Sequence, residues 1–341
     1  MEHIQIGHSD LTVSCIGLGT WAIGGWMWGG TDEAQSIATI REAVHRGVTL
    51  IDTAPVYGFG RSEEIVGKAL AEGGMRRQVA IATKLGLSWK DGKPFRDASP
   101  IRIRREVEDS LRRLRTDVID LYQVHWPDPR TPVVETAQTL ETLRAEGKIR
   151  AIGVSNYSPE QMDTFRAIAK LESVQSPYNL FEREIEADVL PYAVRTGLTL
   201  LSYGPLCRGL LSGKMTPARQ FAGDDLRKID PKFQGARFSR YLEAVHQLEE
   251  LARERYGKSV LALAVRWVLD QGPTIALWGA RSPAQLDAIG EIHGWHLDQD
   301  TKMRIESILE RCAPEPVSPD FMAPPTQSPT TDRKLSQNHG A

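Results

Sequence analysis

Short apolar runs alternate with amphipathic helical patterns along most of this chain, and this alternation restricts its fold more than any other feature. The apolar runs are CIGLGT, TLIDTA, VAIATK, VIDLYQVH, IRAIGVSN, SVQSPY, LTLLSYGPL and TIALWGA. The helical patterns between them cover residues 32–47, 62–72, 99–114, 132–148, 158–170 and 184–197. Strand–helix alternation with short connections predicts parallel strands that close into one α/β barrel, the (β/α)8 or TIM-barrel fold.

Segments outside this alternation predict additions to the barrel. Residues 3–14 form two short runs around Gly-His-Ser-Asp, which predicts a β-hairpin that plugs the bottom of the barrel. Residues 208–240 are rich in glycine, proline and charge, and so predict a long functional loop after the seventh strand. Later helical patterns cover residues 241–257, 259–271 and 299–312. We therefore expect a barrel domain over residues 1–312 and a Pro/Ser/Thr-rich tail over residues 313–341. The FMAPP portion of the tail is expected to dock, and its distal part to be disordered.

Charge and cysteine content exclude several classes of protein. Lys and Arg number 42 against 44 Asp and Glu, and this balance argues against a nucleic-acid binder. The three cysteines form no CxxC pair, which favours a reduced, cytoplasmic compartment. The first residues lack a signal-peptide pattern, and no apolar run approaches the ~20 residues that span a bilayer. We expect no membrane association, no metal site and no obligate protein partner.

Polar side chains stand at the ends of the predicted strands. Asp52 and Tyr57 follow the second run, Lys84 ends the third and His125 ends the fourth. In a parallel barrel, all strand C-termini open onto the face that carries the active site. Each residue alone is more typical of a rim, cap or core position. Together, a phenol, an ammonium, a carboxylate and an imidazole indicate an acid/base site.

At these residues the chain resembles the aldo-keto reductase family, from about Ile4 to Cys312. The matching motifs are IDTAPVYGFGRSEE, the strand-end Lys84, YQVHWPD, IRAIGVSNYS, VQSPYNLFERE, YGPLCRGLLSGK and WGARSPAQL. With the ALWGA strand and the FMAPP segment, it looks most like the bacterial general-stress members. The resemblance implies a TIM barrel that transfers hydride from NADP(H) to small aldehydes and ketones.

Carbonyl reduction needs a hydride for carbon and a proton for oxygen. Tyr57 resembles the family's proton donor, but a free phenol has a pKa of about 10. An ammonium about 4 Å away stabilises phenolate by roughly 4 kcal/mol at an effective dielectric of ~20, which is about three pKa units at most. We therefore expect Lys84 to lower the pKa of Tyr57, Asp52 to hold Lys84, and His125 to orient the carbonyl and share in proton delivery.

The chain lacks a convincing GxGxxG dinucleotide turn, so the cofactor residues follow from the resemblance. It implies that Ser155, Asn156 and Gln175 hold the nicotinamide amide and that Tyr203 stacks on the ring. Ser155-Asn156 could equally serve as a helix N-cap before Ser158-Pro159. The remaining predicted cofactor contacts are Thr20, Trp21, Asp52, Gly204, Leu206, Cys207, Arg208, Gly209, Lys214, Gly279, Arg281 and Gln285.

At the adenine end, the resemblance places Arg281 against the 2′-phosphate, since a guanidinium suits phosphate bidentately. A helix start at Ser282 adds N–H donors there. Many family members carry Glu-Asn where this chain has Ala288 and Ile289, and this departure puts the usual adenine-edge contact in doubt. NADPH preference is therefore expected to depend mainly on the phosphate.

The predicted substrate wall is aromatic, and its residues are Trp21, Tyr57, Trp89, His125 and Trp126. Trp26 and Trp28, in the glycine-rich loop after the first strand, are further candidates because barrel interiors prefer branched aliphatic residues. Two other functions stay open from the sequence. One is a non-catalytic NADPH-bound redox sensor or regulatory subunit. The other is a phosphate-handling barrel enzyme, which would leave Tyr57 and Lys84 without a role.

Overall fold

The computed structural model describes residues 1–326. The predicted disorder of the distal tail therefore concerns residues 327–341, which lie outside the described part of the chain. No helix within residues 1–326 has both the length and the apolar character needed to cross a membrane.

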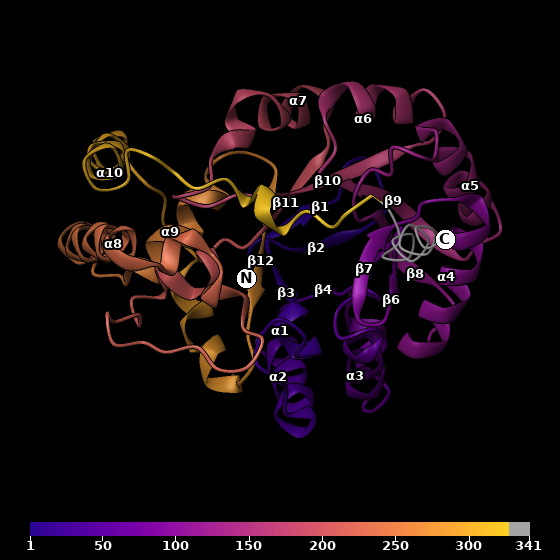
Figure 1. Cartoon of the computed structure of the whole chain (residues 1–341), viewed down its shortest axis with the longest axis horizontal. Coiled ribbons are helices and arrows are strands. Elements are labelled where there is room, and N and C mark those ends of the chain that lie inside the picture. The colour runs from indigo at the N-terminus through magenta and orange to yellow at the C-terminus, as the bar shows by residue number, and fades with distance from the viewer. Residues whose placement is uncertain (327–341) are drawn as a thin grey trace, which may run out of the picture.

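Within residues 1–326, eight parallel strands close into a barrel in the order β10-β11-β12-β3-β4-β5-β8-β9 (Figure 1). The barrel strands are β3 (Ile16–Gly19), β4 (Leu50–Asp52), β5 (Ala80–Leu85), β8 (Ile119–Val124), β9 (Ile149–Ser155), β10 (Leu171–Pro177), β11 (Thr199–Tyr203) and β12 (Thr274–Gly279). Each falls within or overlaps one of the predicted apolar runs. The TIM-barrel prediction is confirmed.

Helices surround the strands. The α-helices are α1 (Trp21–Gly24), α2 (Glu33–His45), α3 (Arg61–Leu70), α4 (Pro100–Leu114), α5 (Val133–Ala145), α6 (Pro159–Arg166), α7 (Val189–Thr196), α8 (Gly235–Tyr256), α9 (Val260–Leu269) and α10 (Gln299–Cys312). The 3₁₀ helices are η1 (Met75–Gln78), η2 (Glu184–Ala187), η3 (Cys207–Ser212), η4 (Leu226–Lys228), η5 (Pro231–Phe233), η6 (Pro283–Glu291) and η7 (Pro319–Met322). In α6, Ser158 and Gln161 form a reciprocal capping box. By contrast, Ser99 before α4 makes no cap bond and donates its hydroxyl to Asp97.

Side-chain alternation along the strands separates the core from the site. In β4, Leu50 belongs to the cluster inside the barrel, whereas Ile51 belongs to the cluster between strands and helices. Asp52, the next residue, therefore points inward again. Lys84 in β5 and Gln123 in β8 follow inward-facing residues at the same spacing of two, so polar side chains occupy the layer above an aliphatic one.

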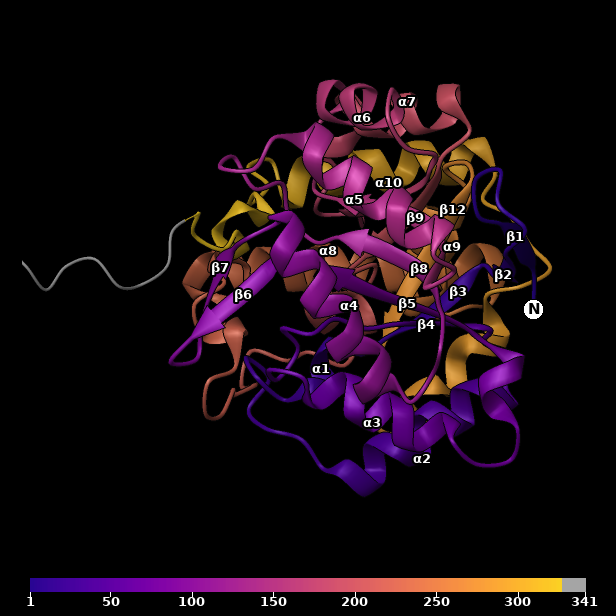
Figure 2. The same cartoon turned by 90° about the vertical axis from the view of Figure 1, so that its right-hand side faces the viewer.

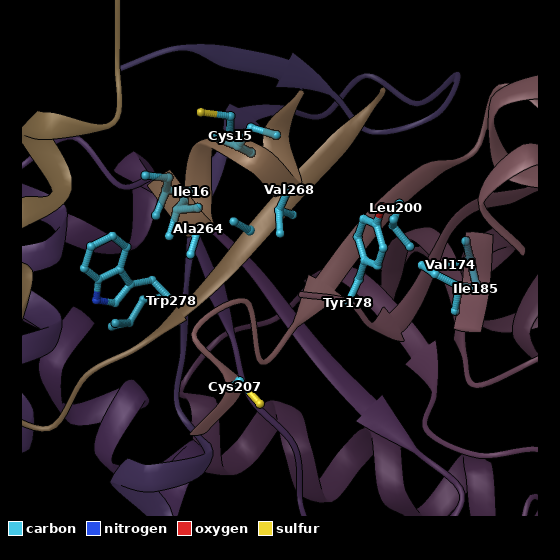
Figure 3. Packing of buried hydrophobic residues seen from close by; sticks show 14 of the residues in the cluster. Cys15, Ile16, Val174, Tyr178, Ile185, Leu200, Cys207, Ala264, Val268 and Trp278 are labelled. Atoms are coloured by element: carbon cyan, nitrogen blue, oxygen red, sulfur yellow. The ribbon is translucent and has the colours of Figure 1, made fainter. Parts of the chain in front are cut away.

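The larger cluster joins the outer faces of the strands to the helices. Ile16 of β3 and Trp278 of β12 lie beside Ala264 and Val268 of α9 (Figure 3). All four side chains are at most 1% exposed. This packing fixes the strands against the helices, and so fixes the height at which each strand ends.

Two hairpins lie at opposite ends of the barrel (Figure 2). The first, β1 (His3–Gln5) with β2 (Thr12–Ser14), contributes Leu11 and Val13 to the inner cluster, which confirms the predicted plug. The second, β6 (Leu87–Lys90) with β7 (Lys93–Arg96), is absent from the sequence prediction. Its two-residue turn is Asp91-Gly92, both with positive φ, and Asp-Gly is a strong type I′ hairpin signal that could have revealed it.

The long connection after β11 is more ordered than predicted. It contains η3, η4 and η5, and α8 begins at Gly235, ahead of the predicted start at Tyr241. The segment after α10 packs back on the barrel, as expected for FMAPP. Lys232 donates to the carbonyl of Val317 at 3.3 Å, and the backbone N–H of Arg96 donates to the carbonyl of Pro325 at 3.0 Å. The tail thus crosses from the β11 connection to the β6–β7 hairpin.

Candidate active site

A cavity of about 340 Å³ opens at the C-terminal end of the barrel strands. Residues from β3, β4, β9, β10, β11 and β12, with the connections after them, contribute to its wall. Such a volume is typical of a small-molecule site. The position agrees with the face where parallel barrels carry their chemistry.

Lys84 is the centre of a buried polar group beneath this cavity. Its Nζ lies 2.6 Å from Asp52 Oδ2, donates to the carbonyl of Thr53 at 3.0 Å and lies 3.2 Å from the phenolic oxygen of Tyr57. Lys84 is fully buried, Asp52 is nearly buried but reaches the cavity wall as predicted, and Tyr57 lines the cavity. The sequence-predicted phenol, ammonium and carboxylate therefore form one connected unit, with the phenol at the exposed end.

Close backbone approach fixes the turn that carries Tyr57. A Cβ added at Gly24 would lie 2.6 Å from the carbonyl carbon of Tyr57, and one at Gly58 would lie 2.2 Å from the carbonyl oxygen of Gly24. Only glycines allow α1 to pack this closely on the turn. The Tyr57 ring then stacks on Trp21, with the ring centroids 6.0 Å apart.

The electrostatics of this unit differ in part from the prediction. Burial disfavours the charge of Lys84, but Asp52 and Tyr57 more than offset it, so the pKa of Lys84 is raised and the ammonium persists. For Tyr57, burial is the larger effect and raises the pKa of the phenol, while Lys84 opposes it. The predicted net lowering of the Tyr57 pKa is therefore wrong for this structure, because desolvation outweighs the nearby ammonium.

His125 lies across from Tyr57, with the two ring centroids 5.8 Å apart in an edge-on arrangement. Its backbone N–H donates to the carbonyl of Leu85, which extends the β5–β8 pairing by one residue. Burial, and then the positive charge of Lys84, hold the pKa of His125 well below its usual range. The imidazole is therefore neutral near pH 7 and can still donate one N–H bond toward a ligand.

Ser155, Asn156, Gln175 and Tyr203 also line the cavity. Asn156 has a left-handed backbone conformation, and its Nδ2 donates to the carbonyl of His125 at 3.0 Å. Tyr203 donates its hydroxyl to Asn156 Oδ1 at 3.1 Å. Ser158 caps α6 by itself, so the alternative role of Ser155-Asn156 as that cap is excluded. These strand-end side chains therefore line the cavity while Asn156 is hydrogen-bonded to its neighbours.

The predicted adenine end reaches the same cavity through Gly279, Arg281 and Gln285. Arg281 donates from its backbone to Gln285 Oε1 at 2.7 Å. Its guanidinium donates to the carbonyls of Trp28 and Gly30, each at 2.9 Å. It therefore ties the connection after β12 to the connection after β3, and both form the rim of the cavity.

A sequence model of the aldo/keto reductase family matches residues 15–310 of this chain. The chain is an aldo-keto reductase. It is 62% identical over 328 residues to the aldo-keto reductase YhdN of Bacillus subtilis (strain 168), with 96% of this chain and 99% of that protein covered. It is 38% identical over 302 residues to the NADH-specific methylglyoxal reductase of Escherichia coli (strain K12), covering 84% and 91%. The glycerol dehydrogenase AKR11B4 from Gluconobacter oxydans has a similar structure, with a TM-score of 0.86, 56% identity, and 94% and 99% covered.

Some predicted residues of this aldo-keto reductase do not reach the cavity with their side chains. The thiol of Cys207 lies in the hydrophobic core (Figure 3), because η3 turns it away from the ligand side. Lys214 is exposed beyond η3 and is not part of the wall. Trp89 packs against Phe59, with 5.6 Å between ring centroids, because it belongs to the unpredicted β6–β7 hairpin.

Arg208 lines the cavity with Gly204, Leu206 and Gly209, as predicted, but its charge is already engaged. Its guanidinium pairs with Glu182 and lies 2.6 Å from Asp230. Thr20 also lines the cavity, but its hydroxyl donates to the carbonyl of Asp52 at 2.9 Å. These contacts indicate that the side chains of Arg208 and Thr20 support the surrounding structure rather than bind a ligand directly.

Two arginines on the rim were missed by sequence reasoning, namely Arg219 and Arg227. Arg227 forms a salt bridge with Asp225 at 2.6 Å and lies over the ring of Trp28. Arg219 is exposed and forms no ion pair among residues 1–326. The irregular composition of residues 208–240 gave no means of ranking its many charges, so only the folded loop identifies them.

The aromatic part of the wall includes Trp21, Trp26, Trp28 and Trp126. Trp126 faces the guanidinium of Arg96, which lies 5.0 Å from its ring centroid. Arg96 in turn donates to the carbonyl of Pro324 at 2.9 Å. Met322 and Pro324 line the cavity, so the docked tail forms part of the wall beside Trp126.

Among residues 1–326, one group has a donor set that could hold a metal, namely Glu2, Cys15 and His293. It lies around the start of β3, at the opposite end of the barrel from the cavity. Arg266 already donates two bonds of 3.1 Å to the Glu2 carboxylate. This group is separate from the candidate active site.

Proposed function

We propose that this aldo-keto reductase reduces small aldehydes or ketones to alcohols with NADPH, and that Tyr57 is the general acid. The observation that carries the proposal is the Tyr57–Lys84–Asp52 unit, with its phenol on the cavity and its charges buried behind. A buried phenol beside a persistent ammonium can give up a proton and have the resulting phenolate stabilised.

The chain's residues divide the chemistry between them. When bound, NADPH supplies the hydride for the carbonyl carbon. Tyr57 gives its proton to the carbonyl oxygen as negative charge develops there, and Lys84 stabilises the phenolate that remains. Asp52 keeps Lys84 charged and in place. The neutral His125 donates an N–H bond to the same carbonyl oxygen and so orients it.

The proposed cofactor contacts come from residues at the strand ends and from arginines on the rim of the cavity. We propose that Ser155, Asn156 and Gln175, which line the cavity, bind the nicotinamide amide and that Tyr203 supports the ring. The guanidinium of Arg219, which forms no ion pair among residues 1–326, and the anchored one of Arg281 give the rim positive charge, which suits a phosphate-rich ligand. This charge is our reason for proposing NADPH preference, although one relative is named as NADH-specific.

The test is a steady-state screen of short aldehydes and ketones against both NADPH and NADH. Multiple turnover with a higher kcat/KM for NADPH would support the proposal. Turnover only with NADH would overturn the cofactor assignment. A tight stoichiometric complex without turnover of any carbonyl would overturn the reductase proposal and favour a nucleotide-bound regulatory subunit.

A further inference from the structure

Gln123 is a buried amide to which the proposed mechanism gives no role. It lies in β8, two residues before His125, so both side chains face the inside of the barrel. Gln123 is fully buried in a layer where barrels ordinarily place aliphatic side chains. A buried amide is costly unless its N–H and C=O groups are paired, so its partners indicate what it does.

The partners of Gln123 are Asp52 and Gln175. Asp52 uses Oδ2 for Lys84 and Oδ1 for two amide nitrogens, Gln123 Nε2 at 3.1 Å and Gln175 Nε2 at 3.0 Å. A carboxylate only accepts hydrogen bonds, so both amides must turn their NH₂ groups toward it. This requirement fixes the orientation of each amide, whichever way either could otherwise be turned.

The amide of Gln175, already oriented by Asp52, is also oriented by Gln123. With its nitrogen on Asp52, Gln123 presents Oε1 to Gln175 Nε2, which lies 3.1 Å away. Both N–H groups of Gln175 are thereby used. Its Oε1 accepts no hydrogen bond from residues 1–326, and the residue lines the cavity. Gln175 therefore offers an acceptor, and no donor, to the ligand.

We propose that Gln123 is a positioning residue that joins the cofactor site to the acid. It holds the Gln175 oxygen toward the primary amide of the nicotinamide, and it holds Asp52, through which Lys84 and Tyr57 are placed. The role of Gln123 in placing Asp52, Lys84 and Tyr57 rests on the proposed function. Its role in orienting Gln175 concerns cofactor binding alone and can be tested without turnover.

The first experiment compares Gln123→Met with Tyr122→Phe in the full-length protein. Methionine keeps the length and volume of the side chain but can neither donate nor accept as an amide does. Tyr122 is the neighbouring buried residue on the outer face, and its hydroxyl forms no hydrogen bond within residues 1–326. Thermal unfolding of both variants shows whether each one folds.

Binding is measured with NADPH and with 2′,5′-ADP, which carries the phosphates but no nicotinamide. Gln123→Met should weaken NADPH binding about tenfold and leave 2′,5′-ADP binding unchanged, because only the amide contact is affected. Tyr122→Phe should change neither. Equal weakening of both ligands, or none, in a folded Gln123→Met variant would overturn the link from Gln123 to Gln175.

The second experiment uses Gln123→Glu and a pH profile of turnover. At high pH, the introduced carboxylate faces Asp52 and repels it, so kcat should fall about ten- to hundredfold. As pH falls, the carboxyl takes up a proton and donates it to Asp52 Oδ1, so kcat relative to wild type should recover. A constant ratio across the pH range would overturn the link to the acid. If the wild type turns over no carbonyl, the proposed function fails, whereas the binding comparison still decides the role of Gln123.

Discussion

The two ends of the site are built differently. At the catalytic end, Asp52, Lys84 and His125 stand on or directly after barrel strands, and buried partners fix them. At the predicted adenine end, Arg219, Arg227 and Arg281 stand on connections between barrel elements. Arg281 bonds to the connection after β3, whereas Arg227 pairs with Asp225 of its own loop. The backbone of a barrel strand is hydrogen-bonded to the strands on both sides, so the position of a side chain on it is fixed. The position of a side chain on a connection depends on which other loop that connection contacts.

Under the proposed function, we expect this difference to separate the residues of the chemistry from those of cofactor selection. The catalytic end has little freedom to rearrange, since its charges are buried and mutually satisfied. The rim has the exposed Arg219 and bonds from Arg281 to backbone carbonyls, which can change without disturbing the core. We therefore expect changes at the strand ends to act on turnover, and changes at the rim to act on cofactor affinity.

The largest effect should come from Tyr57→Phe. The ring still stacks on Trp21, and Lys84 keeps its bonds to Asp52 and to the carbonyl of Thr53. Fold and NADPH affinity should stay near wild type, while turnover should fall by about 10²–10⁴, as for a lost acid/base group. Steady-state kinetics and NADPH titration measure these quantities.

Lys84→Met provides the matched comparison at the same end. It should depress turnover comparably, but it also leaves the Asp52 carboxylate buried without its cation, which destabilises a protein by about 3–5 kcal/mol. The effects on turnover should be far from additive in the double variant, because both changes disable one unit. Retention of most turnover in Tyr57→Phe would move the proton source elsewhere, with His125 as the first candidate.

The same contrast explains how much the sequence could predict. The apolar runs predicted the strands, and the position of Asp52, Lys84 and His125 at the C-terminal ends of those runs predicted their place on one face of the barrel. Motifs on the connections were less informative. Cys207 and Lys214 lie within a matching motif, yet the local turn of η3 points one into the core and leaves the other away from the cavity. Arg219 and Arg227 had no periodic signal at all.

The balance between burial and the Lys84 charge, which sets the pKa of Tyr57, could not be predicted from the sequence either. The effect of Lys84 on Tyr57 was predicted with the correct sign, but the depth of burial that outweighs it depends on atoms contributed by many segments. Gln123 was missed for the same reason. Its position two residues before His125 marks it as inward-facing, but nothing in the strand pattern shows that Gln175 and Asp52 meet it there.

Glu106→Gln tests how a buried carboxyl next to the catalytic end makes the folding stability depend on pH. Glu106 in α4 accepts from the backbone N–H of Gly86, two residues after Lys84. Burial raises the pKa of Glu106 to about 7 from 4.5, although Arg102 opposes the shift. The folded state therefore holds the proton more tightly than the unfolded state. The stability from this group is complete below the unfolded pKa and is lost as pH rises through the folded pKa.

Over that window, the wild type should lose up to about 3 kcal/mol relative to Glu106→Gln, because one pKa unit corresponds to about 1.36 kcal/mol. Denaturant unfolding at about pH 5 and pH 8 measures the difference between the two proteins. A difference that stays constant with pH would show that Glu106 does not titrate in this range.

Arg281→Ala tests the rim. Loss of a charged hydrogen-bond partner costs about 1.5–3 kcal/mol, so the KM for NADPH should rise roughly ten- to hundredfold. Arg281 also donates to the carbonyls of Trp28 and Gly30, so a smaller rise is expected for NADH as well. Arg219→Ala is the comparison variant, because it removes a rim charge that forms no ion pair among residues 1–326 and so should raise the KM for NADPH without loosening the loops. Equal rises for both cofactors in Arg281→Ala would mean that Arg281 acts only by tying the loops.

The smallest effect should come from Asp224→Ala, which loosens the rim without removing a proposed cofactor contact. Asp224 accepts from the backbone N–H groups of Met27 at 2.8 Å and Gly29 at 2.9 Å, so it joins the β11 connection to the connection after β3. These bonds are exposed, so each is worth about 1 kcal/mol, and KM should rise only several-fold for NADPH and NADH alike. Turnover at saturation should be unchanged, because Asp224 bonds to Met27 and Gly29 and not to the Tyr57–Lys84–Asp52 unit. Limited proteolysis should show faster cleavage within residues 208–234, with protection by NADPH reduced. A fall in kcat comparable to that of Tyr57→Phe would contradict the separation of the two ends, since it would mean that the rim controls the chemistry as well as the binding.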